Sequence, residues 1–193
     1  MSQTLVLAST SPFRKQLLEK LHLTFLTEKP NVDETGLADE TAQQLVERLA
    51  IKKAQAITPN FDNALVIGSD QVCVNEGEIL GKPHNFENAF KQLKAASGKT
   101  ITFYTGLALV NSKTGNVQSL VEPFVVKFRK LTDEMISNYL NKEQPYNCAG
   151  SFKSEGYGIA LFEAFEGKDP NSLIGLPLIS LIKMLENEGM QVV

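Results

Sequence analysis

The stretch "LVLASTSPFRKQLLEKL", residues 5–21, indicates the fold class. It begins with a continuous apolar run, which is typical of a buried β-strand. Ser11 then supplies a favourable helix N-cap, Pro12 suits the first helical turn, and leucines follow at helical spacing. A strand that passes directly into a helix, in a chain where strands and helices interleave, indicates an α/β protein.

The turn between this strand and this helix carries several groups that can bind an anion. Backbone N–H groups and the helix dipole favour negative charge at a helix N-terminus. Ser9 adds a hydroxyl group, Arg14 a planar guanidinium suited to bidentate phosphate contact, and Lys15 an ammonium. A capped helix with two solvated cations explains the same residues, so the stretch alone leaves both interpretations open.

Length and charge limit the classes of function. The chain has 193 residues, of which 42% are hydrophobic, so it can form one sizeable core or two lobes that share a cleft. We find no linker or repeat and expect a single domain over residues 1–193. The formal net charge of −3 argues against a nucleic-acid-binding protein, which usually carries an excess of basic residues.

The cysteines and the apolar runs bear on location. Cys73 and Cys148 lack the paired spacing of a zinc site and fit a reducing compartment. No basic segment followed by a long apolar run opens the chain, so we expect no signal peptide. No apolar run approaches the ~20 residues that a membrane helix needs. We therefore expect a cytoplasmic protein without a membrane partner.

The pattern of apolar and turn residues predicts a mixed sheet. We expect strands at 4–9, 23–28, 63–70, 100–111 and 117–131, a short hairpin within 72–83, and helices at 12–21, 41–57, 85–96, 132–142 and 178–188. The third strand is expected to end at Gly68-Ser69-Asp70. The two long strands are separated by "SKTG", a hairpin signal, so part of the sheet should be antiparallel.

Two carboxylates are candidates for chemistry. Asp70 stands at the carboxyl end of a predicted buried strand, where α/β sheets place their ligands. It could act as a general base for water or hold a divalent cation, or it could be a turn aspartate that bonds its own backbone. Glu34, in "VDET" (32–35), offers oxygen ligands for a hard cation, although a solvated turn is an equally simple explanation.

Other charged residues extend this set. Lys53 lies on a predicted helix, Lys82 follows a glycine in "GKP", and Glu155 lies in the glycine-rich "SFKSEGYG". Each is also compatible with a solvated surface position. His22 and His84 are far apart, and no Ser/Cys–His–Asp arrangement is visible, so acyl transfer has little support. Carboxylates and cations together suit the metal-assisted attack of water on a phosphoanhydride.

Several blocks of sequence occur in an order that resembles a known family. They are "LASTSPFRK", "VDET", "AIKKA", "IGSDQV", "GKP", "TGLALV" and "AGSFKSEGYGIALFEAFEGKDPNSLIGLPL". In this order, over roughly residues 5–188, they resemble the Maf family of nucleotide pyrophosphatases. "SDQVC", Phe13 and "CAGSFKSEG" are similar to its YceF-type subgroup. The resemblance implies a Maf/ITPase-like α/β fold, with an elongated mixed sheet flanked by helices and two lobes around a central cleft.

The resemblance also implies an activity. Family members hydrolyse a nucleoside triphosphate to the monophosphate and diphosphate with Mg²⁺ or Mn²⁺, and for the YceF-type subgroup the implied substrate is 7-methyl-GTP. The family often forms dimers, so a homodimer is an option here. Two alternatives stay open at this point: a dTTP/UTP pyrophosphatase of the same family, and a non-catalytic nucleotide-sensing regulator of septum formation.

The roles implied by the resemblance fall on named positions. Asp70 matches the proton acceptor of the family, and Glu34 and Asp70 are the oxygen donors that we expect to hold the cation. The positions linked to base selection are Phe13, Gln71 and Glu155. The polar cleft positions are Ser9, Arg14, Lys15, Glu34, Lys53 and Lys82. Lys15 stands where the family often has a second arginine, so charge is kept but the bidentate geometry is lost.

Overall fold

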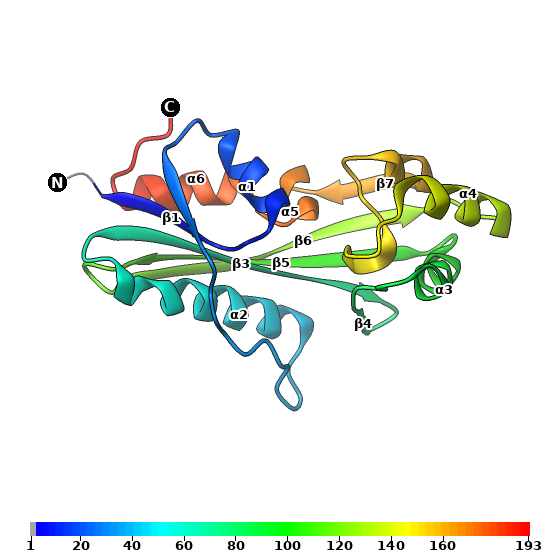
Figure 1. Ribbon diagram of the computed structural model, residues 1–193, viewed down its shortest axis with the longest axis horizontal. Helices are drawn as coiled ribbons and strands as arrows, with labels where there is room; N and C mark the ends of the chain where they lie inside the picture. The colour runs from blue at the N-terminus through cyan, green and yellow to red at the C-terminus, as the bar shows by residue number, and fades with distance from the viewer. Residues whose placement is uncertain (1–2) are drawn as a thin grey trace. The chain divides into compact units, whose positions relative to one another are not determined.

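A computed structural model describes residues 3–193, which form helices and a seven-stranded mixed β-sheet (Figure 1). The strand order is β2-β1-β3-β5-β6-β7, and β4 pairs with β3. β1 is parallel to β2 and β3, whereas β4 is antiparallel to β3 and β7 is antiparallel to β6. The strands are β1 (Thr4–Ala8), β2 (Phe25–Glu28), β3 (Ala64–Asn75), β4 (Glu78–Leu80), β5 (Thr100–Asn111), β6 (Val117–Phe128) and β7 (Phe162–Gly167).

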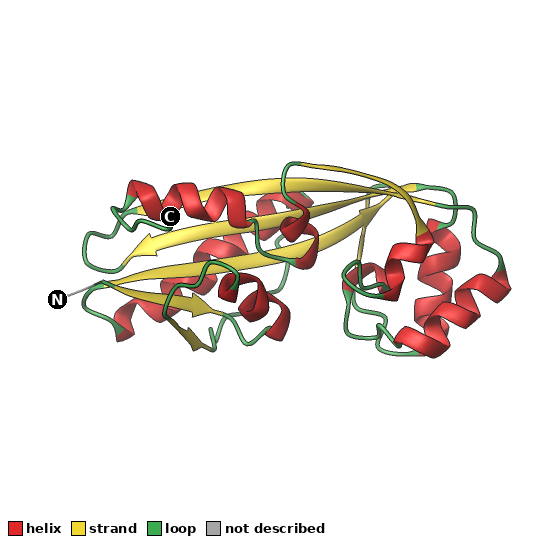
Figure 2. Cartoon of the chain, turned by 90° about the horizontal axis from the view of Figure 1, so that it is seen from above, coloured by secondary structure: helices red, strands yellow, loops and turns green. Residues whose placement is uncertain are grey.

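The helices begin where the sequence supplies capping side chains. At the start of each of the first four helices, the side chain of the N-cap residue accepts a hydrogen bond from a backbone N–H of the first turn; the caps are Ser11, Thr41, Asn85 and Thr132. The α-helices, red in Figure 2, are α1 (Pro12–Glu19), α2 (Ala42–Ile57), α3 (Phe86–Ala96), α4 (Asp133–Glu143), α5 (Pro170–Ile174) and α6 (Leu178–Asn187). Three short 3₁₀ turns lie at Thr58–Asn60, Ala149–Ser151 and Tyr157–Leu161.

The predicted fold class is confirmed, and the strands differ from the prediction mainly in β3 and β7. The predicted end of the third strand at Asp70 is wrong, because β3 continues without interruption to Asn75. Gly68 and Ser69 resemble a turn in sequence, but they lie within the strand. β7 was not predicted, because its alternating "FEAFEG" is short and mostly exposed.

The chain divides into two compact units, and each is described separately. Unit 1 comprises residues 3–71, Thr105–Glu122 and Asp169–Val193, and unit 2 comprises Val72–Tyr104 and Pro123–Lys168. The division does not follow the order of the chain, because both units are built from separated segments. For this reason composition and linker patterns gave no sign of it.

The core of unit 1 lies on both faces of its strands. Residues Leu5 and Leu7 of β1 pack with leucines of α1 and α6, whereas Val6 and Ala8 pack with α2. Figure 1 shows the same arrangement, with α2 on the face of the sheet opposite α1 and α6. Because successive side chains of a strand point to opposite faces, a continuous apolar run is what a strand covered on both sides requires.

Two glycines let α2 approach the sheet closely. A Cβ atom on Gly68 of β3 would lie 2.0 Å from the carbonyl oxygen of Ala50, and one on Gly106 of β5 would lie 2.1 Å from that of Val46. Both carbonyl groups belong to the backbone of α2, which cannot move aside cheaply. These glycines therefore set the distance between α2 and the strands.

Unit 2 has an aromatic core. The rings of Phe103, Phe128, Phe152 and Phe162 pack edge to face, with centroids 4.7–5.5 Å apart. Helices α3 and α4 pack against each other (Figures 1 and 2).

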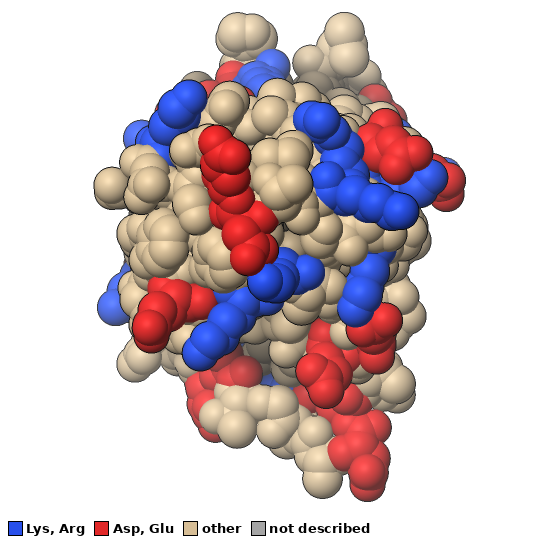
Figure 3. All heavy atoms as spheres, turned by 90° about the vertical axis from the view of Figure 1, so that its right-hand side faces the viewer, with Lys and Arg blue, Asp and Glu red and all other residues tan. Residues whose placement is uncertain are grey.

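On the face of the molecule in Figure 3, acidic and basic side chains lie interspersed. Among residues 3–193, no helix is both long enough and apolar enough to span a membrane.

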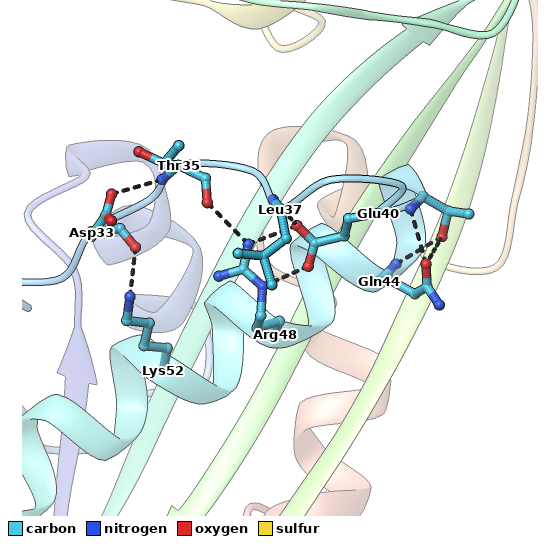
Figure 4. A network of polar contacts seen from close by, with 8 residues as sticks. Asp33, Thr35, Leu37, Glu40, Gln44, Arg48 and Lys52 are labelled. Atoms are coloured by element: carbon cyan, nitrogen blue, oxygen red, sulfur yellow. Dashed lines mark hydrogen bonds and ion pairs between the residues drawn. The ribbon is translucent and has the colours of Figure 1, made fainter.

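A polar network holds the segment between β2 and α2 against that helix (Figure 4). The Arg48 guanidinium donates to both carboxylate oxygens of Glu40, over 2.5 and 2.7 Å, and to the backbone oxygen of Thr35. The Lys52 ammonium donates to the backbone oxygen of Asp33 over 2.8 Å. Two side chains of α2 therefore fix the backbone on either side of Glu34.

We expect Gly106→Ala to destabilise the protein by about 2–4 kcal/mol, because the added methyl group overlaps the α2 backbone. Urea unfolding measures the change. Gly36→Ala is the matched control, because nothing lies within 4 Å of a Cβ atom there, and its change should stay within about 0.5 kcal/mol. Equal stabilities for the two variants would contradict the close approach of α2.

The Glu40–Arg48 pair predicts a pH dependence. Hydrogen bonds from Arg48 and from the N–H of Leu37 lower the pKa of Glu40 from 4.5 to about 2. The stabilisation is complete above pH ~4.5 and is lost as pH falls toward 2. Glu40→Gln should therefore lower the unfolding free energy at pH 6 and reduce its loss between pH 6 and 3. Urea unfolding at both pH values tests this, with Glu78→Gln on β4 as a control for net charge.

Candidate active site

The site in unit 1 lies where β3 extends beyond its neighbour. The register of β1 with β3 ends at Leu7 and Ile67, and β1 itself ends at Ala8. The next residues of β3, Gly68 to Gln71, therefore continue past the end of β1. Asp70 is therefore not at the end of its own strand, as predicted, but it lies beyond the carboxyl end of β1, and α/β sheets bind ligands where strands end.

A buried ammonium joins the two predicted carboxylates. Lys53 of α2 is 6% exposed, and its Nζ lies 2.7 Å from Asp70 Oδ1 and 2.9 Å from Glu34 Oε1. Asp70 is 8% exposed, so this ion pair is largely removed from water. A solvated position for Lys53, one of the two options open from the sequence, is thereby excluded. The side chains at 34, 53 and 70 form one charged cluster.

Arg14 joins this cluster from α1. Its Nε donates to the backbone oxygen of Gly175 over 2.9 Å. Burial lowers the pKa of Arg14, while the charges of Asp70 and Glu34 act in the opposite direction. Arginine stays protonated even so. Gly175 has φ +121°, a conformation that side chains rarely adopt, which explains glycine at the residue that orients Arg14.

The carbonyl groups at the C-terminal end of α5 bind further side chains of unit 1. Ser69 Oγ donates to the Gly175 oxygen over 2.9 Å, the same oxygen that Arg14 uses. Gln71 Nε2 donates to the backbone oxygens of Ser172 and Leu173, over 2.8 and 3.1 Å. The Ser172 oxygen also accepts from the Gly175 N–H, whereas the oxygens of Leu173 and Gly175 lie at the end of the helix, where local backbone donors run out, and these side chains supply donors to them.

The start of α1 is a compact turn. Ser9 is 7% exposed, and its Oγ accepts a hydrogen bond of 3.1 Å from the Ser11 N–H. Phe13 is half-buried on α1. Lys15 is exposed, and its Nζ lies 3.7 Å from Glu19 Oε1. Lys15 also lines a hollow of about 640 Å³ beside β2. Its role in phosphate binding stays a prediction.

Two predicted residues belong to unit 2. Lys82 and Glu155 are both exposed there. The loop of Glu155 is anchored by Glu143, which accepts hydrogen bonds from Lys153 Nζ over 3.0 Å and from the Tyr157 N–H over 2.9 Å. The expectation that Lys82 and Glu155 share a groove with the residues of unit 1 also stays a prediction.

The structure brings together four of the predicted residues, Arg14, Glu34, Lys53 and Asp70. Sequence reasoning missed Gly175, which orients Arg14, and the residues that hold α5 beside it, which are Ser69, Thr105 and the capping Asp169. The side chains of Ser69 and Thr105 have no charge and match no motif of the site chemistry, so the only signal was their place in the blocks "IGSDQV" and "TGLALV".

Comparison with known proteins identifies the family. A protein named 7-methyl-GTP pyrophosphatase, from Colwellia psychrerythraea strain 34H, is 62% identical over 190 residues, which are 98% of this chain and 95% of the relative. One of the same name from Vibrio vulnificus strain CMCP6 is 63% identical over 188 residues, 97% and 96% of the two chains.

A solved structure supports the fold alone. The Staphylococcus aureus Ham1 protein matches with a TM-score of 0.55 at 14% identity, over 96% of this chain and 100% of that one. The family described as Maf-like protein matches residues 4–188. Because this match covers nearly the whole length, the chain belongs to the Maf-like protein family.

Proposed function

We propose that this protein is a 7-methyl-GTP pyrophosphatase of the YceF-type subgroup. It would hydrolyse 7-methyl-GTP to 7-methyl-GMP and diphosphate, and so remove a modified nucleotide. The observation that carries the proposal is identity of 62 and 63% to two proteins of that name over nearly the full length of each chain. The charged cluster of unit 1 supplies a setting for this chemistry.

In the proposed reaction Asp70 acts on a water molecule. Its Oδ1 is held by Lys53 over 2.7 Å, so we assign Oδ2 to the water. As the water oxygen bonds to the α-phosphorus, Asp70 accepts the proton that the water loses. The bond between the α-phosphorus and the oxygen that bridges to the β-phosphorus breaks, and diphosphate leaves with that oxygen.

Cations would stabilise the charge of the triphosphate. Arg14 is suited because Gly175 holds its Nε, which leaves the two terminal nitrogens of the guanidinium for phosphate oxygens. Lys53, already close to Asp70, would act on the same charge. We assign supporting contacts to Ser9, Lys15 and Lys82.

We further propose that Mg²⁺ or Mn²⁺ takes part. Glu34 and Asp70 each use one oxygen on Lys53 Nζ, over 2.9 and 2.7 Å, so Glu34 Oε2 and the remaining lone pairs of the Asp70 carboxylate would hold the cation. Among residues 3–193, no group of three or more His, Cys, Asp or Glu could hold a metal. The donors therefore fit a cation that takes its other ligands from phosphate and water, and such a cation withdraws charge from phosphate oxygens.

Base selection would use an aromatic ring and a carboxylate. 7-Methylguanine carries a delocalised positive charge, which favours the ring of Phe13 and the exposed carboxylate of Glu155. Gln71 would contact the base as well.

We also place the activity in the cytoplasm, a reducing compartment that suits the free thiols of Cys73 and Cys148. We keep a homodimer as an expectation.

A nucleotide panel tests the proposed function. Release of diphosphate is measured for 7-methyl-GTP, GTP, dTTP and UTP, with Mg²⁺, with Mn²⁺ and with excess EDTA. We expect the highest kcat/KM for 7-methyl-GTP and loss of turnover in EDTA. Higher values for dTTP or UTP would favour the other branch of the family. Nucleotide binding without any diphosphate would favour the non-catalytic regulator.

Asp70→Asn should reduce kcat for the best substrate by about 10²–10⁴, the usual contribution of a general base. Far-UV circular dichroism checks that the variant is folded, since Lys53 loses its charged partner. The control Asp33→Asn also removes a loop carboxylate, one that accepts a hydrogen bond from the Thr35 N–H, and should keep most of the parent turnover. A folded Asp70→Asn variant with the parent kcat would refute the role of Asp70.

A further inference from the structure

A buried hydroxyl group outside the charged cluster is bonded to a predicted base-selecting residue. Thr105 of β5 is fully buried at 0% exposure. Its Oγ1 donates to the backbone oxygen of Ser172 over 2.8 Å and accepts from Gln71 Nε2 over 2.9 Å. A hydroxyl group can donate one hydrogen bond, and Thr105 donates it to the Ser172 oxygen. Thr105 can therefore only accept a hydrogen bond from Gln71.

These contacts fix the orientation of the Gln71 amide. Its nitrogen faces three acceptors: the hydroxyl oxygen of Thr105 and the backbone oxygens of Ser172 and Leu173. The reverse orientation would place the amide oxygen against two carbonyl oxygens, which is unfavourable. Among the described residues, Oε1 of Gln71 accepts no hydrogen bond. The polar atom that remains for a ligand is therefore an acceptor.

We propose that Thr105 is a positioning residue for base selection, which acts by holding the Gln71 amide so that Oε1 is offered to an N–H donor of the base. This inference rests on the proposed function, in which Gln71 contacts the base. The exocyclic amino group of guanine is such a donor. Thr105 would therefore support recognition of that amino group, and it would not affect recognition of the 7-methyl group.

Two ratios of kcat/KM separate these contributions. The amino ratio compares 7-methyl-GTP with 7-methyl-ITP, which differs only in lacking the amino group. The methyl ratio compares 7-methyl-GTP with GTP. Thr105→Val removes the hydroxyl group at nearly constant volume and should lower the amino ratio about fivefold, as expected for one hydrogen bond, with the methyl ratio unchanged. Thr105→Ser keeps the hydroxyl group and should restore the amino ratio.

Controls distinguish positioning from a general loss of stability. Ser97→Ala removes a hydroxyl group of unit 2 that bonds the backbone of Leu131 twice, and it should leave both ratios unchanged. In a Gln71→Ala background, Thr105→Val should cause no further change in the amino ratio, because the two residues act in series.

Several results would overturn the proposal. They are an unchanged amino ratio in Thr105→Val, an equal fall in both ratios, or an additive effect in the Gln71→Ala background. If Thr105→Val does not fold, Gln71→Ala still tests the proposal, because Thr105 acts through Gln71. An unchanged amino ratio in Gln71→Ala would overturn it. A parent protein that releases no diphosphate from 7-methyl-GTP would instead refute the proposed function, so the two failures are distinguishable.

Discussion

The buried ammonium of Lys53, held between Asp70 and Glu34, is the interaction on which the site of unit 1 depends. Removing charges from water is costly, and an ion pair largely removed from water is tolerated only when its geometry is good. Here the contacts are 2.7 and 2.9 Å. The close approach of α2 to β3, which Gly68 permits, brings the Lys53 side chain within reach of the strand. A glycine in the sheet is thus a condition for the charged cluster.

Stability alone does not explain such a pair. Replacing a buried ion pair with apolar residues of similar volume is often neutral or stabilising, so the energetic argument favours a hydrophobic contact at this place. A cluster of carboxylate, ammonium and guanidinium groups is explained if the site binds a charged ligand. In the proposed function, the polyphosphate of a nucleotide would bring negative charge, and Arg14, Lys53 and the two carboxylates would accept it together with a cation.

The sequence predicted elements with local signals and missed those decided by packing. Capping residues and helical spacing located α1 to α4 within one or two residues. The helical spacing placed Lys53 on the same face as Leu49, Ala50 and Ile57, which indicates burial. The charge of a lysine indicates a solvated position, so the sequence left both options open. The course of β3 through Asp70 was not readable, because "GSD" resembles a turn. Only the packing of α2 explains the glycine there.

The short helix α5 and the site stabilise each other. A helix of five residues is too short to be stable alone, and its last carbonyl groups need donors. Gln71, Thr105, Ser69 and Arg14 supply them. The same bonds fix the orientation of these four side chains, so α5 and the site residues cannot be disturbed independently. Residues without charge or motif can therefore affect the chemistry of this site through the backbone oxygens of one helix turn.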